Sequence, residues 1–210
     1  MPELAILPMD DSVRGRELVF RYETAFYYDP VLTETPEGWR LTLERKPFPA
    51  PVTRQFTDTL LAPWLEEPRV FAARAEGRDL GYLELSHETW NNRMRISNLW
   101  VAEDCRRQGI GAALMARAEA EARRAGARAL VLETQSCNHP AISFYRRQGF
   151  ALTGLDLTAY SQTDVEKQEI RLEFARPAPF EKETGTPCPA IASDASMKRY
   201  SGSCPPSSAR

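Results

Sequence analysis

The sequence predicts an α/β fold in which a mixed, mostly antiparallel, twisted sheet is flanked by helices. The first observation behind this prediction is a run of strand signals with only turns between them, at residues 70–75, 80–86 and 93–101. Such a run is typical of an antiparallel meander. The second observation is an alternation of helix and strand signals over residues 112–174, which supplies the helices that cover the sheet.

The segment before the meander is expected to begin with a strand, Glu3 to Leu7, and to continue as a helix. Residues 10–12 offer helix N-caps, and Pro30 would stop the helix. Its apolar face consists of residues at helical spacing: Leu18, Val19, Tyr22, Ala25 and Phe26. Further on, Trp39 to Glu44 is expected to be extended, and Val52 to Trp64, between prolines, to form a second helix.

The segment after the meander predicts a helix at Ala112 to Ala125, with Gly126 as its C-cap. Its buried stripe is formed by Leu114, Met115, Ala118 and Ala122. The remaining elements are a buried strand at Ala129 to Leu132, a short helix at Ala141 to Arg147 closed by Gly149, and paired strands at Ala151 to Tyr160 and Val165 to Phe174.

Length and composition predict one domain over residues 1–176 and a tail over residues 177–210. The tail holds six prolines and six serines with few large apolar residues, so we expect it to be disordered. The formal net charge of -2 gives no basic field for nucleic acid. No apolar run is long enough to span a membrane, and the N-terminus lacks a signal peptide, so a cytoplasmic protein without a membrane partner is expected.

The four cysteines are Cys105, Cys137, Cys188 and Cys204. They contain no Cys-x-x-Cys pair and no metal-ligand spacing with His87 or His139, so we expect reduced thiols and no metal site.

The segment Arg106-Arg107-Gln108-Gly109-Ile110-Gly111 lies between an apolar strand and an amphipathic helix. Glycines let a backbone approach a phosphate closely, and a helix N-terminus adds unpaired N–H donors and a positive dipole end. The segment lacks the Gly-x-Gly-x-x-Gly of a dinucleotide fold and the Gly-Lys-Ser/Thr of a Walker loop. A tight turn without a ligand remains the alternative, and the preceding antiparallel meander disfavours it.

A second pattern follows at Asn138, Ala141, Phe144, Tyr145, Gly149 and Phe150, which reads Asn-x-x-Ala-x-x-Phe-Tyr-x-x-x-Gly-Phe. With Leu99 and Val101, and with Arg106, Gly109, Gly111 and Ala112, it resembles the GNAT superfamily of acetyl-CoA-dependent N-acetyltransferases over residues 80 to 160. Within that superfamily, GYLELSHETWNN, LETQSCNHPA and FALTGLDLTAY are similar to streptothricin acetyltransferases, which acetylate a β-lysine amine of a cationic antibiotic.

The resemblance implies the GNAT fold and an acetyl-CoA site. The pyrophosphate would lie on the backbone N–H groups of residues 107 to 112, and the pantetheine beside the strand that ends at Val101. Asn138 would bond the cofactor, and Tyr145 would lie near its sulfur. The implied cofactor-binding residues are Leu99, Trp100, Val101, Arg106, Arg107, Gln108, Gly109, Ile110, Gly111, Ala112, Asn138, Ala141, Phe144 and Tyr145.

Acetyl transfer to an amine needs a neutral amine, a stabilised thioester oxygen and a proton for the leaving thiolate. Tyr145 matches the family tyrosine and is the candidate acid, with a half-buried packing aromatic as the alternative. Glu133, at the strand end twelve residues before Tyr145, is the candidate base; a carboxylate that caps the strand end is the alternative. Glu84 is a rival base or acceptor-binding residue, because alternation places it on one face with Tyr82 and Ser86; an exposed carboxylate is its alternative.

By resemblance to the streptothricin enzymes, Asp156 and Tyr160 are expected to help hold a cationic acceptor. Asp164 is expected to be a solvated turn residue, and Trp90 and Trp100 to be packing residues. His139 is expected at the solvent edge, and covalent catalysis by Cys137 is disfavoured because no base is paired with it in the sequence.

The leading prediction is acetylation of a small cationic amine by a monomer or homodimer. Residues 30–68 are expected to shape the acceptor pocket. Acetylation of a protein N-terminus or lysine is the second hypothesis, which an open acceptor groove would favour over an acidic, closed one. Binding of acyl-CoA without turnover is the third, and the presence of Tyr145 disfavours it.

Overall fold

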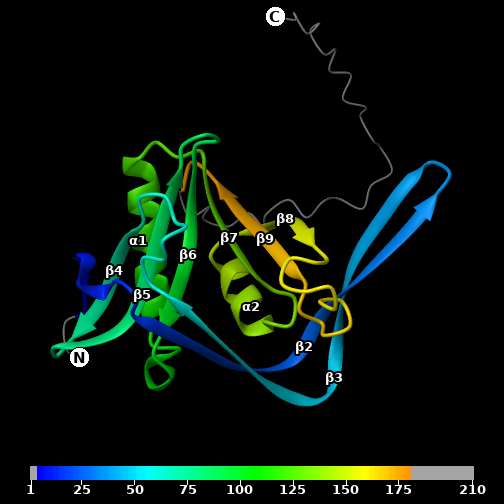
Figure 1. Cartoon of the computed structure of the whole chain (residues 1–210), viewed down its shortest axis with the longest axis horizontal. Coiled ribbons are helices and arrows are strands. Elements are labelled where there is room, and N and C mark those ends of the chain that lie inside the picture. The colour runs from blue at the N-terminus through cyan, green and yellow to red at the C-terminus, as the bar shows by residue number, and fades with distance from the viewer. Residues whose placement is uncertain (1–3, 181–210) are drawn as a thin grey trace, which may run out of the picture.

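The computed structural model describes residues 4–180. Strands form one seven-stranded sheet, and two further strands form a separate antiparallel ribbon (Figure 1). The strands are β1 (Ala5–Met9), β2 (Glu17–Thr35), β3 (Gly38–Thr59), β4 (Arg69–Ala75), β5 (Arg78–Glu88), β6 (Arg93–Val101), β7 (Ala129–Gln135), β8 (Ala151–Asp156) and β9 (Arg171–Pro177). The helices are α1 (Ile110–Arg124) and α2 (His139–Arg147), with short 3-10 turns at Asp11–Val13 and Glu103–Cys105.

The sheet has the strand order β1-β4-β5-β6-β7-β9-β8. Its strands pair antiparallel except for β6 and β7, which are parallel. The expected meander is therefore confirmed as β4-β5-β6. Both expected helices of the second half are also confirmed, and they end where Gly126 and Gly149 adopt positive φ angles of 64° and 85°. These angles suit glycine because it lacks a Cβ.

The pairing of β6 with β7 is short. It joins Arg93–Arg95 to Ala129–Val131 and then stops, although both strands continue. Beyond this point the two strands diverge, which leaves their facing backbone groups without the ladder that a continuous sheet would give them. The sheet consequently opens into a cleft between β6 and β7 at the end where α1 and α2 begin.

The expected helices in the N-terminal third are wrong. Most of each segment belongs to the long ribbon of β2 and β3, whose register runs from Glu17 opposite Thr59 to Thr35 opposite Gly38, and residues 60–64 contain no helix. Alternate residues Leu18, Phe20 and Tyr22 share one face of β2, as the period of a strand requires. Both strands of the ribbon have a free edge, so the prolines of β3 are tolerated there. The expected extended segment Trp39 to Glu44 is confirmed within β3.

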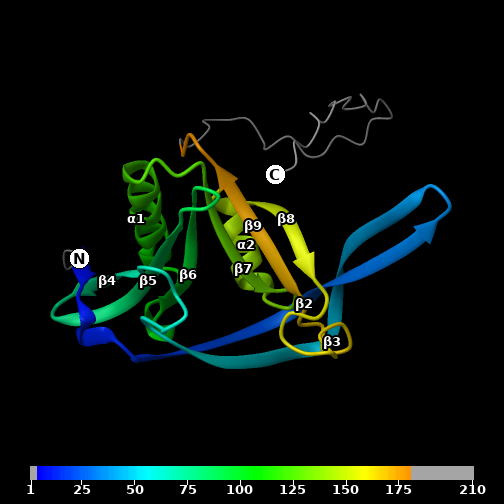
Figure 2. The same ribbon diagram turned by 45° about the horizontal axis from the view of Figure 1, so that its top comes forward.

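The ribbon starts beside β4 and β5, crosses the sheet and passes the end of β7, and its tip projects beyond the body (Figures 1 and 2). Its first part packs against the sheet through a small core that includes Val13, Leu18, Leu60, Leu61 and Tyr82. Further along, Tyr28 N donates to Ser136 O at 3.0 Å, which ties the ribbon to the segment before α2. The ribbon therefore covers the side of the cleft opposite the helices.

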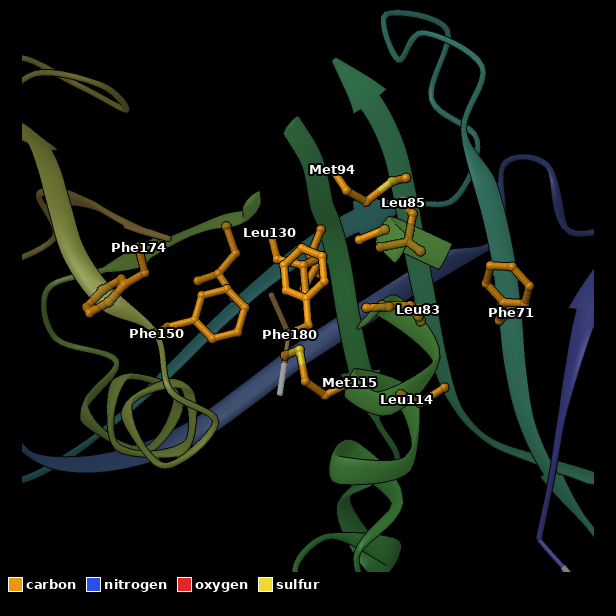
Figure 3. Close-up of a cluster of buried hydrophobic side chains, with 14 of the residues drawn as sticks. Phe71, Leu83, Leu85, Met94, Leu114, Met115, Leu130, Phe150, Phe174 and Phe180 are labelled. Atoms are coloured by element: carbon orange, nitrogen blue, oxygen red, sulfur yellow. The ribbon is translucent and has the colours of Figure 1, made fainter. Parts of the chain in front are cut away.

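The main core lies between the sheet and the two helices (Figure 3). Leu114 and Met115 of α1 face Leu83 and Leu85 of β5, and all four are at most 1% exposed. Phe180 also lies in this core and is 2% exposed. The tail was predicted to begin at residue 177, but Pro177 ends β9 and Phe180 is buried, so the folded part extends at least to residue 180. The rest of the predicted disordered tail lies outside the described residues.

The last two strands are shorter than predicted. β8 ends at Asp156 and β9 begins at Arg171, and the loop between them contains Asp164. Asp164 was expected to be solvated, but it is 1% exposed, and its carboxylate accepts hydrogen bonds from Tyr160 N at 2.8 Å and Ser161 Oγ at 2.6 Å. It organises the loop that carries Tyr160. Among the described residues, no helix has the length and apolar character needed to cross a membrane.

Candidate active site

A cavity of about 980 Å³ occupies the cleft between the diverging strands. Its walls come from the ends of β6 and β7, the loop before α1, α2, and the inner side of the ribbon. The strands, loop and helix that the sequence predicted therefore enclose a single cavity. The ribbon, which was not predicted, closes one side of it.

The loop before α1 has the geometry of an anion cradle. Arg107 and Gly109 have positive φ angles of 63° and 87°, and Gly109 is the N-cap of the helix. The first helical hydrogen bond runs from Ala113 N to Gly109 O at 3.0 Å, so the preceding N–H groups have no acceptor within the helix. A Cβ at Gly111 would lie 3.4 Å from Phe144 Cζ and would narrow the passage between loop and α2. These features fit the pyrophosphate and pantetheine of CoA.

Arg106 braces this loop. Its Nε donates to Val101 O at 3.2 Å and its Nη1 donates to Arg21 O of the ribbon at 2.6 Å. Both contacts use backbone oxygens, so neither partner is a carboxylate that would neutralise the guanidinium beside the cavity. Arg107 and Arg147 also line the cavity, which gives its loop and α2 walls a positive charge.

Most of the residues predicted for the cofactor do line this cavity. They are Leu99, Trp100, Val101, Arg106, Arg107, Gly109, Gly111, Ala112, Asn138, Ala141, Phe144 and Tyr145. Two do not. Ile110 is 4% exposed and packs in the main core, and the exposed Gln108 donates from Nε2 to Asp104 O at 3.1 Å. The side chains of these two residues therefore do not reach the cavity, and only their backbone N–H groups could contact a phosphate.

Asn138 has a structural role in addition to its place in the cavity wall. Its Oδ1 accepts a hydrogen bond from Ala141 N at 3.2 Å, so it is the N-cap of α2. This cap fixes the start of the helix that carries Phe144 and Tyr145.

Tyr145 is half-buried on α2. Its ring centroid lies 5.6 Å from that of Phe144 and 6.2 Å from that of Phe150. Burial raises the pKa of its hydroxyl to about 12, because the phenolate would lose its hydration. The hydroxyl therefore stays protonated at neutral pH and is available as a proton donor in the cavity.

Glu133 reaches the cavity from β7 with 38% of its side chain exposed. Its Oε2 lies 3.6 Å from Arg171 Nη1 and 3.9 Å from Arg95 Nη1. Tyr160, which also lines the cavity, has a hydroxyl whose pKa is raised by burial and by the neighbouring Glu133 charge. The structure thus brings Glu133, Tyr160 and Tyr145 to one cavity.

Two other predicted residues do not line it. Asp156 accepts from Thr158 N at 2.9 Å and lies 3.5 Å from Arg171 Nη2, so it supports the arginine beside Glu133. Glu84 is 0% exposed; its carboxylate accepts from Leu61 N at 2.6 Å and from Asn98 Nδ2 at 2.8 Å. Its burial also contradicts the alternative of an exposed carboxylate, and a β-bulge between Glu84 and Leu85 interrupts the simple alternation.

Four further residues were not expected to take part in the chemistry, and the structure shows where each of them lies. Trp100 lines the cavity and donates from Nε1 to Val19 O at 2.9 Å, whereas Trp90 is 81% exposed, so its expected packing role is wrong. His139 is partly exposed and contacts the ring of Phe26, at 5.2 Å between centroids. Cys137 is 0% exposed, and burial raises the pKa of its thiol.

The sequence missed the contribution of the ribbon. Phe20, Tyr22, Phe56 and Asp58 line the cavity, so part of the 30–68 segment, residues 56–58, contributes to its wall. The signal that would have found them is the period-two alternation of Leu18, Phe20, Tyr22 and Thr24.

Two diverging strands, a glycine-containing anion cradle at a helix N-terminus and a protonated tyrosine in the same cleft define a CoA-dependent acyltransferase. The model of the acetyltransferase (GNAT) family matches residues 39–150, just over half of the chain. The chain belongs to that family, whose members use acetyl-CoA.

Streptothricin acetyltransferase of Streptomyces lavendulae is 40% identical over 114 residues, which are 54% of this chain and 60% of that protein. The match thus spans less than two thirds of this relative. The crystal structure of nourseothricin acetyltransferase has 30% identity and a TM-score of 0.66, covering 84% of this chain and 99% of that one. A Bacillus anthracis str. Ames structure in complex with acetyl coenzyme A shares the fold, at 19% identity and a TM-score of 0.59, over 83% of this chain and 99% of that one.

Proposed function

We propose that this enzyme transfers an acetyl group from acetyl-CoA to a primary amine of a small cationic acceptor of the streptothricin type. The observation that carries the proposal is the separation of charge in the cavity. Arg107 and Arg147 line the walls formed by the loop and α2, whereas the carboxylates among the lining residues, Asp58 and Glu133, belong to the ribbon and β7. The ribbon also contributes Arg21 to the lining. This arrangement suits an anionic donor on one side and a cationic acceptor on the other.

Acetyl-CoA supplies the activated acetyl group when it is bound. The backbone N–H groups of residues 107–112 and the side chains that line the cleft would hold its phosphates and pantetheine. The free backbone N–H groups at the end of β6, near Val101, would polarise the thioester carbonyl. Asn138, which already caps α2, would contribute its side-chain amide to the cofactor.

The proton transfers would belong to Glu133 and Tyr145. A lysine-type amine has a reference pKa of about 10.4 and must lose a proton to attack. Glu133 is the carboxylate in position to accept that proton, directly or through water, and Tyr145 is the neutral acid that would protonate the leaving thiolate. Tyr160, beside Glu133, would contact the acceptor. Asp156 would act through Arg171, and Glu84, another candidate from the sequence, would act as a support beneath the ribbon.

The ribbon favours a small molecule over a peptide substrate. An extended peptide needs an open groove, and here Arg21 O and Val19 O of β2 are bonded to Arg106 and Trp100 across the cavity. The similarity to streptothricin acetyltransferases points to the same class of acceptor. We further propose that the enzyme works in the cytoplasm as a monomer or homodimer; the described cysteines, Cys105 and Cys137, are free thiols.

The test is CoA release from acetyl-CoA with and without streptothricin, with the product identified by the mass of one added acetyl group. Streptothricin-dependent release that is lost in Tyr145→Phe would support the proposal. Release with peptide amines but not with streptothricin would instead support a peptide acetyltransferase. CoA binding without release with any amine would support a non-catalytic module.

A further inference from the structure

The ribbon places a carboxylate over the cleft at a position that no sequence motif indicates. In the register of the ribbon, Asp58 lies opposite Leu18, and Phe56 lies opposite Phe20. Directly paired residues of antiparallel strands point to the same face. Leu18 is 2% exposed against the sheet, so Asp58 points toward the sheet as well, and it lines the cavity.

The charge of Asp58 is not balanced by a cation. Its Oδ1 accepts a hydrogen bond from Thr59 N at 2.7 Å, and none of the ion pairs within residues 4–180 includes it. Glu133, by contrast, lies near both Arg95 and Arg171. Of the two carboxylates that line the cavity, Asp58 is therefore the one that no cation within residues 4–180 pairs with.

Aromatic rings flank this carboxylate. Phe20 and Phe56 are stacked at 4.7 Å between centroids with an interplanar angle of 5°, and both line the cavity beside Asp58. Trp100 also lines the cavity and donates a hydrogen bond from Nε1 to Val19 O of the ribbon. A carboxylate next to aromatic faces is a favourable environment for an ammonium or guanidinium group, since both attract the cation.

The subsite is displaced from the reaction centre. Tyr22 of the ribbon lies beside β7, because its hydroxyl donates a hydrogen bond to Gln135. Asp58 lies farther along the ribbon, opposite Leu18. The four-residue separation corresponds to about 13 Å along a strand. A cation at Asp58 would thus lie on the order of 10 Å from an amine at Glu133.

We propose that Asp58, Phe20 and Phe56 form a second cation subsite, which binds a distal ammonium or guanidinium of the acceptor while another amine of the same molecule is acetylated. This inference rests on the proposed function. It adds that the enzyme selects acceptors with two separated positive charges and discriminates against acceptors with one.

The experiment compares 1,8-diaminooctane with octylamine as acceptors for the wild type, Asp58→Asn and Glu23→Gln. The asparagine side chain retains an oxygen that can accept from Thr59 N, so Asp58→Asn removes charge without removing the turn contact. Glu23 is exposed and does not line the cavity, so Glu23→Gln is the matched control for a charge lost from the ribbon. Steady-state KM and kcat are measured for each acceptor, and KM for acetyl-CoA.

We expect Asp58→Asn to raise KM for 1,8-diaminooctane about ten-fold, the size of a lost charge-assisted contact, and to leave kcat unchanged. KM for octylamine and for acetyl-CoA should stay the same, and Glu23→Gln should have no effect. An equal change of KM for both amines, or no change for either, would overturn the subsite. Phe56→Leu, which keeps an apolar side chain without the ring, should raise KM for the diamine in the same selective way.

Failure of the proposed function would have a different signature. If the wild type acetylates neither these amines nor streptothricin, the acceptor assignment fails as a whole. The subsite is then tested by calorimetric titration of streptothricin into the CoA-bound enzyme. Heat of binding that falls in Asp58→Asn and not in Glu23→Gln would support the subsite by itself, and equal binding by all three proteins would overturn it.

Discussion

The hydroxyl of Tyr22 donates a hydrogen bond to Oε1 of Gln135 at 2.8 Å and so joins the ribbon to the end of β7 across the cleft. The same hydroxyl lies 3.2 Å from Sγ of Cys137. Burial raises the pKa of this hydroxyl above its ordinary value, so it remains a neutral donor at any pH at which the protein is handled. Because Gln135 and Glu133 share one face of β7, the contact also positions the ribbon relative to the candidate base.

We therefore predict that Tyr22→Phe will loosen the ribbon. Loss of the buried hydrogen bond should lower the free energy of unfolding by about 1 kcal/mol, because the Gln135 oxygen loses its donor. KM for the acceptor should rise while KM for acetyl-CoA changes little. Urea denaturation and steady-state kinetics measure the two effects. Tyr27→Phe is the control, since no hydrogen bond among the described residues uses the Tyr27 hydroxyl; equal effects of both variants would contradict the prediction.

The anion cradle predicts a pair of substitutions at Gly111. Gly111→Glu should abolish acetyl-CoA binding, because it adds bulk next to Phe144 and a negative charge where a phosphate is expected. Gly111→Gln adds nearly the same bulk without the charge, so it should weaken binding less. Calorimetric titration with CoA measures both affinities, and circular dichroism checks that both variants fold. Retained affinity in Gly111→Glu would show that the loop does not bind phosphate.

Tyr145 yields a prediction about turnover. Tyr145→Phe should lower kcat about 100- to 10,000-fold, the range for loss of a general acid, and leave the Kd of acetyl-CoA unchanged. Since burial raises the pKa of Tyr145 to about 12, its acid form persists below that pH and is lost only as the pH rises through 12. The pH profile of the wild type should accordingly show no decline from Tyr145 below about pH 11. An unchanged kcat in the variant would remove Tyr145 from the acid role.

Glu133→Gln should also slow the reaction, and the size of its rate defect should depend on pH. The defect should be largest near neutral pH, where the amine is protonated, and should shrink as the pH approaches the amine pKa of about 10.4, because less deprotonation is then required. Measurement of kcat/KM from pH 7 to 10 for the variant and the wild type tests this. A defect that is constant across the range would assign Glu133 to acceptor binding and not to proton transfer.

The second half of the fold could be predicted because local signals there agree with the tertiary structure. The strand that ends at Val101, the helix ended by Gly126 and the helix that carries Tyr145 each have a clear hydrophobic period and a local stop signal. The glycines of the cradle are needed by the local backbone itself, as the positive φ of Gly109 indicates. The cofactor side of the site was therefore accessible to sequence reasoning.

The ribbon could not be predicted in the same way, because the hydrophobic pattern of β2 fits both a helix and a strand. Leu18, Tyr22, Ala25 and Phe26 fit one face of a helix, whereas Leu18, Phe20, Tyr22 and Thr24 alternate as in a strand. The register shift between Thr24 and Phe26 interrupts that alternation. Residue composition favours a strand, since β2 is rich in β-branched and aromatic residues. The turn at residues 36–37, in the sequence Thr-Pro-Glu-Gly, is a local hairpin signal, but the pairing of Glu17 with Thr59 at the far end of the ribbon joins residues distant in the sequence. The ribbon's contribution to the cavity wall, including Asp58, was missed with it.

Glu84 provides a final prediction, because the structure gives it a supporting position beneath the ribbon and outside the cavity wall. Burial raises its pKa, and the hydrogen bonds from Leu61 N and Asn98 Nδ2 counteract only part of that effect. The folded state then binds a proton more tightly than the unfolded state, so stability should fall as the pH rises from the ordinary carboxyl range through the raised pKa. In Glu84→Gln this pH-dependent loss should be absent.

The same substitution places an amide group where Asn98 Nδ2 now finds an acceptor, which should lower the free energy of unfolding by about 1–3 kcal/mol. The deficit should be largest at acid pH and shrink as the pH rises, because only the wild type then loses stability by ionising Glu84. Turnover per folded enzyme should persist, because Glu84 does not itself line the cavity and reaches its wall only through the hydrogen bond from Asn98. Urea titrations between pH 4 and pH 8 together with kcat at neutral pH separate the two roles. A stable variant with strongly reduced kcat would instead make Glu84 a direct participant in the reaction, since a supporting carboxylate acts on kcat only through the fold.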